Sequence, residues 1–159
     1  MTKIESLPLP LIAKAQVMIQ KPRAAVFKWL VDFENNYPRF FPGVIEMTAL
    51  DNLPIGALGK RYRELVDLGP KKEALELSIT KIIENQEIQI EPEVELFMPT
   101  FQFLFLAIEP EVTEFHWRFY SRVTDPDKIS SVKNTVGKLL GTRAIAAMKN
   151  LSDLTEIEL

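Results

Sequence analysis

A row of strand patterns with no helix between them constrains this chain more than any other feature. After Gly43, apolar and polar side chains alternate, as in LELSIT at residues 75–80, and such alternation is typical of a strand with one buried face. Turn residues such as those at 52–56 separate the patterns. The expected strands are residues 44–50, 59–68, 73–83, 87–95, 100–108 and 113–123. Because no helix joins them, we expect them to pair as an antiparallel meander.

The segment before these strands predicts one further strand and a helical region. Residues 13–20 alternate like a half-buried strand. Pro22 suits the first turn of a helix, where its missing N–H costs nothing, and residues 26–31 then place apolar side chains at helical spacing. Residues 37–42, which contain two prolines, predict a turn or a second short helix.

The chain ends in one long helical pattern. Asp125 is a suitable N-cap and Pro126 a suitable first helical residue, and apolar side chains keep to one face over residues 127–156, a length of about 45 Å. This helix is the only element large enough to cover one face of a sheet. The sequence therefore predicts an α+β fold in which a curved antiparallel β-sheet wraps around a long C-terminal helix.

Length and composition favour a single domain that uses neither a metal nor a cofactor. A chain of 159 residues is of one-domain size, so we expect residues 1–159 to form one domain. The net charge of −3 and the lack of a basic stripe argue against a nucleic-acid partner. With no cysteine and one histidine, the chain offers no disulfide, no thiol nucleophile and no ligand set for zinc.

No segment predicts passage through a membrane. The longest apolar run, residues 98–108, is interrupted by Gln102 and falls far short of the roughly 20 residues that span a bilayer. The first residues carry Glu5 and two prolines where a signal peptide needs an unbroken apolar stretch. We therefore expect no integral membrane segment and a cytoplasmic location.

The single histidine is a weak candidate for catalysis. His116 alternates along its strand with Phe115, Trp117 and Phe119. If the aromatic face is turned inward, His116 points out toward solvent. We expect a solvent-facing histidine, and no catalytic residue is assigned.

Several loose motifs, in a characteristic order, resemble a known family. They are Ile19-Gln20-Lys21-Pro22 followed by Val26-Phe27 and Leu30, Asp32-Phe33-Glu34-Asn35 with Tyr37-Pro38, Gly56-x-x-Gly59 before a strand, and Thr113-x-Phe115-x-Trp117 on the last strand. The chain resembles the START-like (SRPBCC, Bet v 1-like) superfamily with its helix-grip fold, especially the polyketide cyclase/dehydrase-like branch. Residues 37–42 also resemble a segment of the coenzyme Q-binding branch. The resemblance implies a hydrophobic cavity between the sheet and the long helix.

Aromatic residues on two neighbouring strands are the first candidates for the wall of such a cavity. Phe101, Phe103 and Phe105 share one strand face, and Trp117 shares the next with two phenylalanines. Each ring is either plain core or cavity wall. Gly141, in a stripe of small residues on the facing helix, would leave room for a ligand. In the ring-rich stretch before the strands, we expect Tyr37 at the pocket mouth and the other rings in the core.

Two polar side chains fall on faces that are otherwise apolar. Tyr62 lies on the strand that begins at Gly59, and Arg143 lies on the apolar stripe of the long helix. A buried guanidinium cannot lose its charge and needs a polar partner. That partner is either the ligand or an internal carboxylate such as Glu64.

These features favour a protein that binds a small hydrophobic or amphipathic ligand, without a cofactor. The alternative is a cofactor-independent cyclase, aromatase or dehydratase in which Tyr62 and Arg143 polarise a substrate carbonyl. A third class, a co-chaperone or membrane-surface adaptor, would have a cavity too small for a ligand. The predicted ligand-binding residues are Tyr37, Tyr62, Phe101, Phe103, Phe105, Trp117, Gly141 and Arg143.

One strand looks apolar on both faces. Leu104, Leu106 and Ile108 lie opposite the phenylalanine face of their strand, whereas a water-facing strand normally alternates with polar residues. We therefore predict that a second subunit covers this outer face, giving a homodimer. The alternative cover is the N-terminal segment at residues 7–10.

Overall fold

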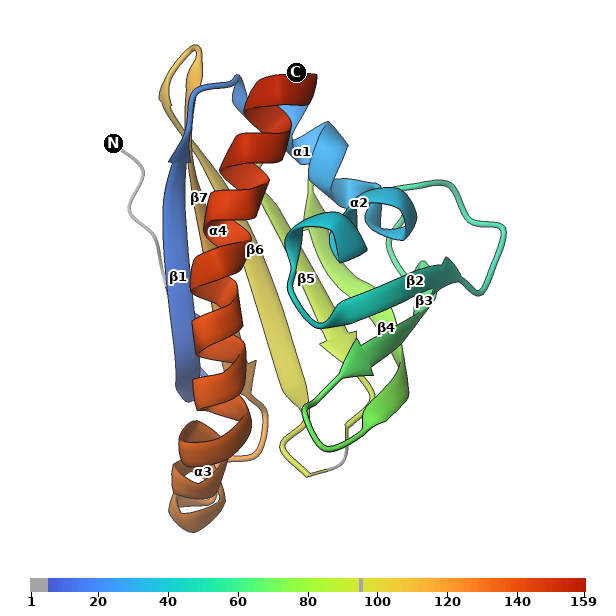
Figure 1. The fold of residues 1–159 in the computed structure, drawn as a ribbon, viewed down its shortest axis with the longest axis vertical. Coiled ribbons are helices and arrows are strands. Elements are labelled where there is room, and N and C mark those ends of the chain that lie inside the picture. Colours follow the sequence, from blue (N-terminus) through green and yellow to red (C-terminus); the bar gives the residue numbers. More distant parts are fainter. Residues whose placement is uncertain (1–5, 95) are drawn as a thin grey trace.

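The computed structural model describes residues 6–94 and 96–159 and contains an antiparallel seven-stranded sheet that curls around one long helix (Figure 1). The strands are β1 (Leu11–Ile19), β2 (Val44–Ala49), β3 (Arg61–Asp67), β4 (Lys72–Ile83), β5 (Glu87–Pro92), β6 (Pro99–Glu109) and β7 (Val112–Ser121). The helices are α1 (Arg23–Val31), α2 (Phe33–Phe40), α3 (Pro126–Val132), the π-helical turn η1 (Lys133–Gly137) and α4 (Lys138–Glu158). The α+β fold predicted from the sequence is confirmed.

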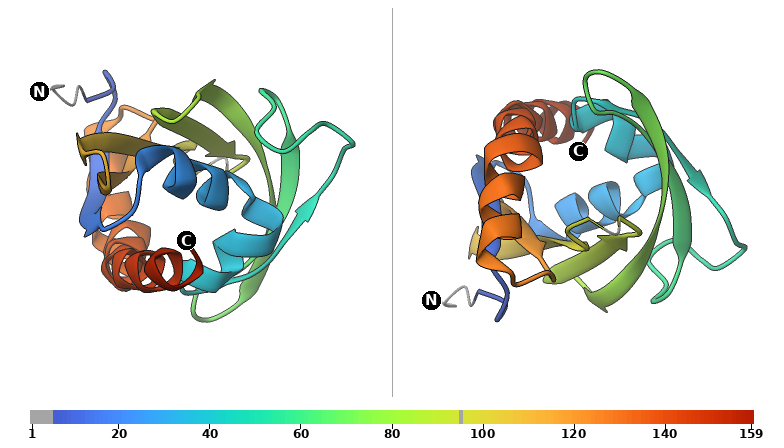
Figure 2. Two further views of the ribbon diagram at one scale, coloured as in Figure 1. Left: turned by 90° about the horizontal axis from the view of Figure 1, so that it is seen from above. Right: turned by 90° about the horizontal axis from the view of Figure 1, so that it is seen from below.

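The strand order confirms the meander and shows where the first strand joins it. The order across the sheet is β1-β7-β6-β5-β4-β3-β2, so strands β2 to β7 pair with their neighbours in sequence. Strand β1 pairs with β7, which brings the two ends of the chain together, and the long helix packs along β1. Seen from above, α1 and α2 lie on the side opposite the sheet's outer surface and help to close its concave face (Figure 2).

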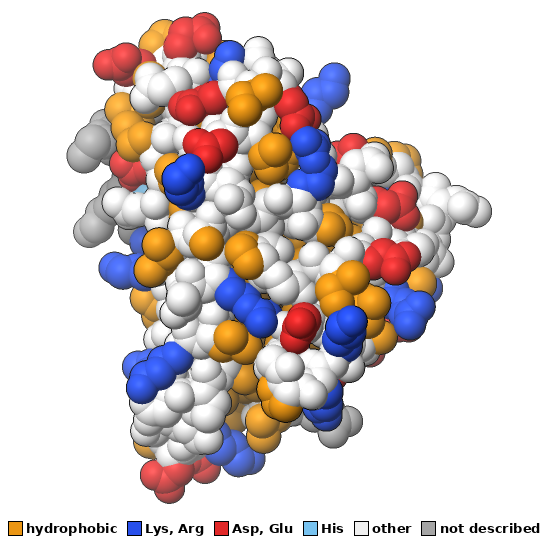
Figure 3. Space-filling view, in the orientation of Figure 1, with side chains coloured by type: hydrophobic (Ala, Val, Ile, Leu, Met, Phe, Trp, Pro, Cys, Tyr) orange, Lys and Arg blue, Asp and Glu red, His pale blue; other side chains and the backbone are white. Residues whose placement is uncertain are grey.

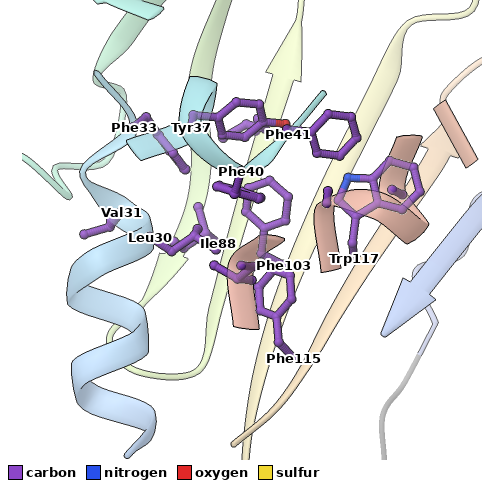
Figure 4. Packing of buried hydrophobic residues seen from close by; sticks show 14 of the residues in the cluster. Leu30, Val31, Phe33, Tyr37, Phe40, Phe41, Ile88, Phe103, Phe115 and Trp117 are labelled. Carbon is purple, nitrogen blue, oxygen red and sulfur yellow. The ribbon is translucent and has the colours of Figure 1, made fainter. Parts of the chain in front are cut away.

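The inner face of the sheet forms an aromatic core with α1 and α2. Phe103, Phe115 and Trp117 are fully buried there, as the alternation predicts. Phe33 of α2 packs on Phe103 with ring centroids 6.1 Å apart, and Figure 4 shows these side chains converging below α2. Burial of so many rings fixes which face of each strand is turned inward, because a one-residue slip would expose all of them.

The C-terminal helix begins as predicted and approaches β1 closely. The Asp125 side chain accepts hydrogen bonds from the backbone N–H groups of Asp127 and Lys128 at 2.9 and 3.4 Å. A Cβ atom at Gly137 would lie 2.8 Å from Ile12 Cγ2, and one at Gly141 would lie 3.6 Å from Ala13 Cβ. The small residues therefore face β1 and allow close helix–strand packing, where the sequence had suggested that they leave room for a ligand.

His116 lies on the outer face of the sheet as predicted, but it is not exposed to solvent. Only 6% of the residue is exposed, and its Nε2 atom lies 2.6 Å from Glu114 Oε1. It lies in register between Gln16 of β1 and Leu104 of β6. Neighbouring strands on both sides, which a single-strand pattern does not reveal, account for its burial.

The same outer face carries a buried polar network. Tyr120 donates to Gln102 Oε1 at 3.2 Å, and Gln102 Nε2 donates to Glu87 at 2.8 Å. The backbone N–H of Leu7 lies 3.4 Å from the Tyr120 hydroxyl, so the N-terminal segment lies over this end of β7.

Within the described ranges, no helix is long and apolar enough to cross a membrane.

Candidate functional site: a cavity between the sheet and the long helix

A cavity of about 310 Å³ is lined by residues of the β3–β4 turn, the loop between β5 and β6, and the start of α4. These three segments lie toward the lower end of the molecule in Figure 1. Most of its lining is aliphatic or aromatic. The apolar lining residues are Tyr37, Phe41, Pro42, Val44, Val66, Leu68, Leu75, Leu77, Ile90, Pro92, Val94, Leu96, Phe97, Pro99, Phe101, Val136 and Leu140. Leu96 is 68% exposed and marks the mouth.

Glu64 is the buried polar group of this cavity. It lies on β3 between Tyr62 and Val66, and all three side chains face inward because inward positions alternate along the strand. Only 8% of Glu64 is exposed. Burial alone raises the pKa of its carboxyl from the ordinary value of 4.5 to about 7, without any contribution from a hydrogen bond or a nearby charge. A carboxyl in this setting exchanges a proton near neutral pH.

Tyr37 lies in the wall of the same cavity. Its ring stacks on that of Phe41, with centroids 5.8 Å apart and an angle of 16° between the planes. Burial raises the pKa of the Tyr37 hydroxyl well above its ordinary value, and the nearby charge of Glu64 raises it further. The hydroxyl therefore stays protonated and can donate a hydrogen bond.

Two of the residues that the sequence proposed for the site, Tyr37 and Phe101, line the cavity. Phe103, Phe105 and Trp117 belong to the packed inner face and do not line it. Trp117 lies just behind the wall, because its ring packs on those of Phe41 and Phe101, each 5.8 Å away. The Trp117 indole nitrogen is buried without a hydrogen-bond partner (Figure 4).

Tyr62 is buried in the core and does not line the cavity. It is 1% exposed and packs edge-on against Phe33, with centroids 5.6 Å apart. The Lys60 ammonium lies 5.4 Å from the centre of its ring. Burial is the main cause that raises the pKa of the Tyr62 hydroxyl, so it stays protonated. Gly141 faces β1 and is not part of the lining either.

Arg143 bridges the long helix and the ends of β2 and β3. Its guanidinium donates to the backbone carbonyl of Asp67 and fills the space that a side chain at Gly43 would need. The side chain is half-buried and does not line the cavity. Its partner is therefore a main-chain oxygen, and the alternative of an ion pair with Glu64 is not realised.

Glu64 is not among the site residues predicted from the sequence. The sequence pattern suggests it only as a partner for Arg143, although the residue falls on the inward face of its strand, in step with Tyr62. An acidic residue at an inward position is the signal that was available, since buried carboxylates are rare unless they are paired. Among the described residues, no group of three or more histidine, cysteine, aspartate or glutamate side chains is arranged to hold a metal ion.

No family model matches the chain, and no curated protein matches it. Several solved structures match the chain. A START superfamily protein from Mycobacterium smegmatis is 18% identical, with a TM-score of 0.72 over 94% of this chain and 99% of that protein. The Zhui aromatase/cyclase from a Streptomyces species is 13% identical, with a TM-score of 0.71 over 91% and 92% of the two chains. A protein from Thermus thermophilus is 18% identical, with a TM-score of 0.72 over 92% and 97%.

The chain has the START-like helix-grip fold. These structural matches confirm the fold that the sequence motifs predicted. Sequence identities of 13–18% establish a shared fold and no more. Aromatase/cyclases and a START superfamily protein share this fold. A shared fold does not fix a shared activity, so the function is argued from the cavity itself.

Proposed function

We propose that this protein binds a small hydrophobic or amphipathic molecule in the cavity between its sheet and its long helix. The observation that carries the proposal is a cavity of about 310 Å³ whose lining, among the described residues, is apolar apart from the carboxyl groups of Glu64 and, at its edge, Glu73 and the hydroxyl of Tyr37. Ligand sites typically have volumes of about 300–1,000 Å³ and combine apolar walls with a few polar groups. A cavity of this size argues against the adaptor class, for which we expected too little room.

Filling the cavity with a side chain tests the proposal. Val66 faces the cavity from β3, whereas its neighbour Leu65 points to the opposite face of the strand. Val66→Phe should abolish binding of apolar ligands, and Leu65→Phe, which adds a ring on the other face, should preserve it. Native mass spectrometry of the purified proteins, followed by solvent extraction of what travels with them, reads this out directly. Equal ligand retention by both variants would contradict the proposal.

Tryptophan fluorescence offers a second measurement. Trp117 packs on two rings of the cavity wall, Phe41 and Phe101, so a bound molecule should change its emission. Trp29 lies elsewhere and donates to Glu158, so Trp29→Phe leaves Trp117 as the single reporter. A screen of quinones, flavonoids, sterols and amphiphiles that gives neither quenching nor a thermal shift would count against binding.

An enzyme of the cyclase, aromatase or dehydratase type is the second candidate, and one observation favours it. Glu64, with a pKa of about 7, and the protonated Tyr37 face one apolar cavity, which is a suitable pair for moving a proton to or from a carbonyl compound. Tyr62 and Arg143, which we had expected in this role, do not line the cavity. Turnover of a polyketone substrate that Glu64→Gln abolishes and Tyr62→Phe leaves intact would favour the enzyme.

Two further expectations from the sequence are kept as proposals. One is a homodimer formed through Leu104, Leu106 and Ile108 of β6. The other is a cytoplasmic location, which cell fractionation tests.

A further inference from the structure

The charged side chains known to line the cavity are acidic. Among the described residues, its lining includes two carboxyl groups, Glu64 in the interior and Glu73 near the mouth, and no lysine, arginine or histidine. Lys and Arg side chains are visible on the surface around this end of the molecule (Figure 3), and none of the described ones belongs to the cavity lining. Whatever occupies the interior meets an acid and no base.

Among the described residues, none of the groups that face Glu64 from the surrounding elements carries a positive charge that could balance its carboxylate. In the sheet it lies in register between Met47 of β2 and Leu75 of β4, both apolar. From α2 it meets Tyr37, and from the start of the long helix the lining residues are Val136 and Leu140.

Two charged side chains close to the cavity, Glu73 and Arg143, are engaged by other groups. Glu73 pairs with Lys71 at 2.7 Å on the turn between β3 and β4. On α4, Arg143 donates to the carbonyl of Asp67. Glu64 thus combines two properties in one place: it is more than nine-tenths buried, and it lines the cavity without a partner among the described residues.

We propose that the ligand of this cavity is an apolar molecule whose polar end is a hydrogen-bond donor, preferably an amine, held by the Glu64 carboxyl, and that carboxylate ligands such as fatty acids are excluded. This proposal rests on the proposed binding function and specifies its ligand class. A buried carboxyl without a partner is costly, and a donor supplied by the ligand satisfies it. An ammonium group forms the stronger, charge-assisted bond.

Exclusion of carboxylates follows from the same geometry. A fatty acid that enters head first brings a second negative charge next to Glu64, and like charges in a poorly solvated site repel strongly. A fatty acid that enters tail first leaves its carboxylate at the mouth beside the Glu73–Lys71 ion pair, gains no contact with Glu64, and leaves the buried Glu64 carboxyl without a hydrogen-bond donor. Among the described residues, the cavity lining offers the anion no cation in either orientation.

The titration of Glu64 gives the proposal a pH dependence. At pH 8 its carboxyl is mostly ionised and at pH 6 it is mostly protonated, because burial sets its pKa at about 7. If an ammonium ligand binds the ionised form, its affinity should fall about tenfold between pH 8 and pH 6. Tyr37 stays protonated in this pH range and Glu73 is paired with Lys71, so we expect neither residue to cause a comparable change in affinity.

Three probes that share one chain and differ in their polar end test the proposal. Octylamine, octanol and octanoate, each below its micelle concentration, are titrated calorimetrically into the wild-type protein at pH 8. We expect octylamine to bind at least tenfold more tightly than octanol, and octanoate to bind most weakly. Glu64→Gln should remove the preference for the amine and its pH dependence. Glu76→Gln, which changes an exposed carboxylate on β4, should leave both unchanged.

The outcomes separate the two proposals. If octanol and octanoate bind as tightly as octylamine, the cavity binds ligands but Glu64 does not select them, and only this inference is overturned. If the amine preference survives in Glu64→Gln, the selecting group lies elsewhere and the inference is equally wrong. If no probe binds at either pH, the binding function itself fails and the inference fails with it.

Discussion

At the scale of single residues, Glu64 is where the demands of folding and of function conflict most clearly. Burial opposes the charge of its carboxyl in the folded protein and raises its pKa from 4.5 to about 7. A residue that only filled the core would be apolar. A glutamate at a position where burial disfavours its charged form is a candidate functional residue.

The first prediction concerns the pH dependence of stability. The folded pKa of Glu64, about 7, lies above its ordinary value of 4.5, so the folded state binds the proton more tightly than the unfolded state. The stabilisation is complete below pH 4.5 and is lost as the pH rises toward 7 and beyond. Glu64→Gln should remove this loss and raise the free energy of unfolding at pH 8 by about 3 kcal/mol.

Urea unfolding at pH 5 and pH 8 measures the effect. Wild-type protein should lose stability between these values, and Glu64→Gln should lose less. Glu46→Gln, which replaces an exposed carboxylate on β2, serves as the control and should follow the wild type. A Glu64→Gln protein that is less stable than the wild type at pH 8 would mean that the carboxylate has a partner.

The second prediction concerns Arg143. Its guanidinium ties α4 to the carbonyl of Asp67 at the end of β3, outside the cavity lining. Arg143→Met should lower the free energy of unfolding by about 1–2 kcal/mol, the effect of losing a partly exposed hydrogen bond to a charged group. Octanol affinity should not change. Chemical unfolding and calorimetry on this variant measure both, and a loss of affinity at unchanged stability would return Arg143 to the site.

The sequence supplied part of this residue-scale description. Alternation along the strands placed Phe103, Phe115 and Trp117 on the inner face, and they are buried there. It could not tell which rings would face empty space, because that depends on where the long helix begins and how closely it packs on β1. Only Tyr37 and Phe101 of the predicted site residues reach the lining.

At the scale of elements, strands were easier to predict than the details of helices. Every expected strand is present, with ends shifted by a few residues; the expected end of the 87–95 strand, residue 95, lies outside the described residues. The long helix is present from Pro126 to Glu158, but it contains the π-helical turn η1. The apolar spacing of residues 127–156 gave no signal for this turn.

The third prediction uses two glycines of this helix as a matched pair. Alanine is favoured over glycine in helices by about 1 kcal/mol. At Gly141 a Cβ meets Ala13 Cβ at 3.6 Å, an ordinary contact, so Gly141→Ala should stabilise the fold by up to about 1 kcal/mol. At Gly137 a Cβ would lie 2.8 Å from Ile12 Cγ2 and 3.0 Å from the Val132 carbonyl oxygen, so Gly137→Ala should destabilise it by about 1–2 kcal/mol.

Thermal unfolding of the two variants decides this prediction by sign. Opposite shifts of the melting temperature are expected. If both variants are stabilised, the helix can move away from β1 at no cost, and the close approach at Gly137 is not a constraint on the fold.

At the scale of the whole molecule, the inner face of the curled sheet carries the aromatic core and the cavity, and its outer face mixes apolar and polar side chains. Leu104 and Leu106 are half-buried on the outer face, and Ile108 is 44% exposed. Their neighbours in register are polar: Glu87 and His116 lie on either side of Leu104, and Glu114 lies beside Leu106. The second face of β6 is therefore less uniformly apolar than the sequence of that strand alone suggests.

The last prediction concerns association through this outer face. Stable interfaces bury about 1,200–2,000 Å² in total, and a two-fold contact places the same patch on both partners. Because carboxylates interrupt the patch around Leu104, Leu106 and Ile108, we expect a weak homodimer that forms only at high concentration. Light scattering over a range of concentrations should show a rising mass for the wild type and a monomer for Ile108→Lys. Ile145→Lys, a matched change on the exposed side of α4, should behave as the wild type does. A wild-type monomer at every concentration would rule out the dimer, and the exposed Ile108 would then be an ordinary surface residue.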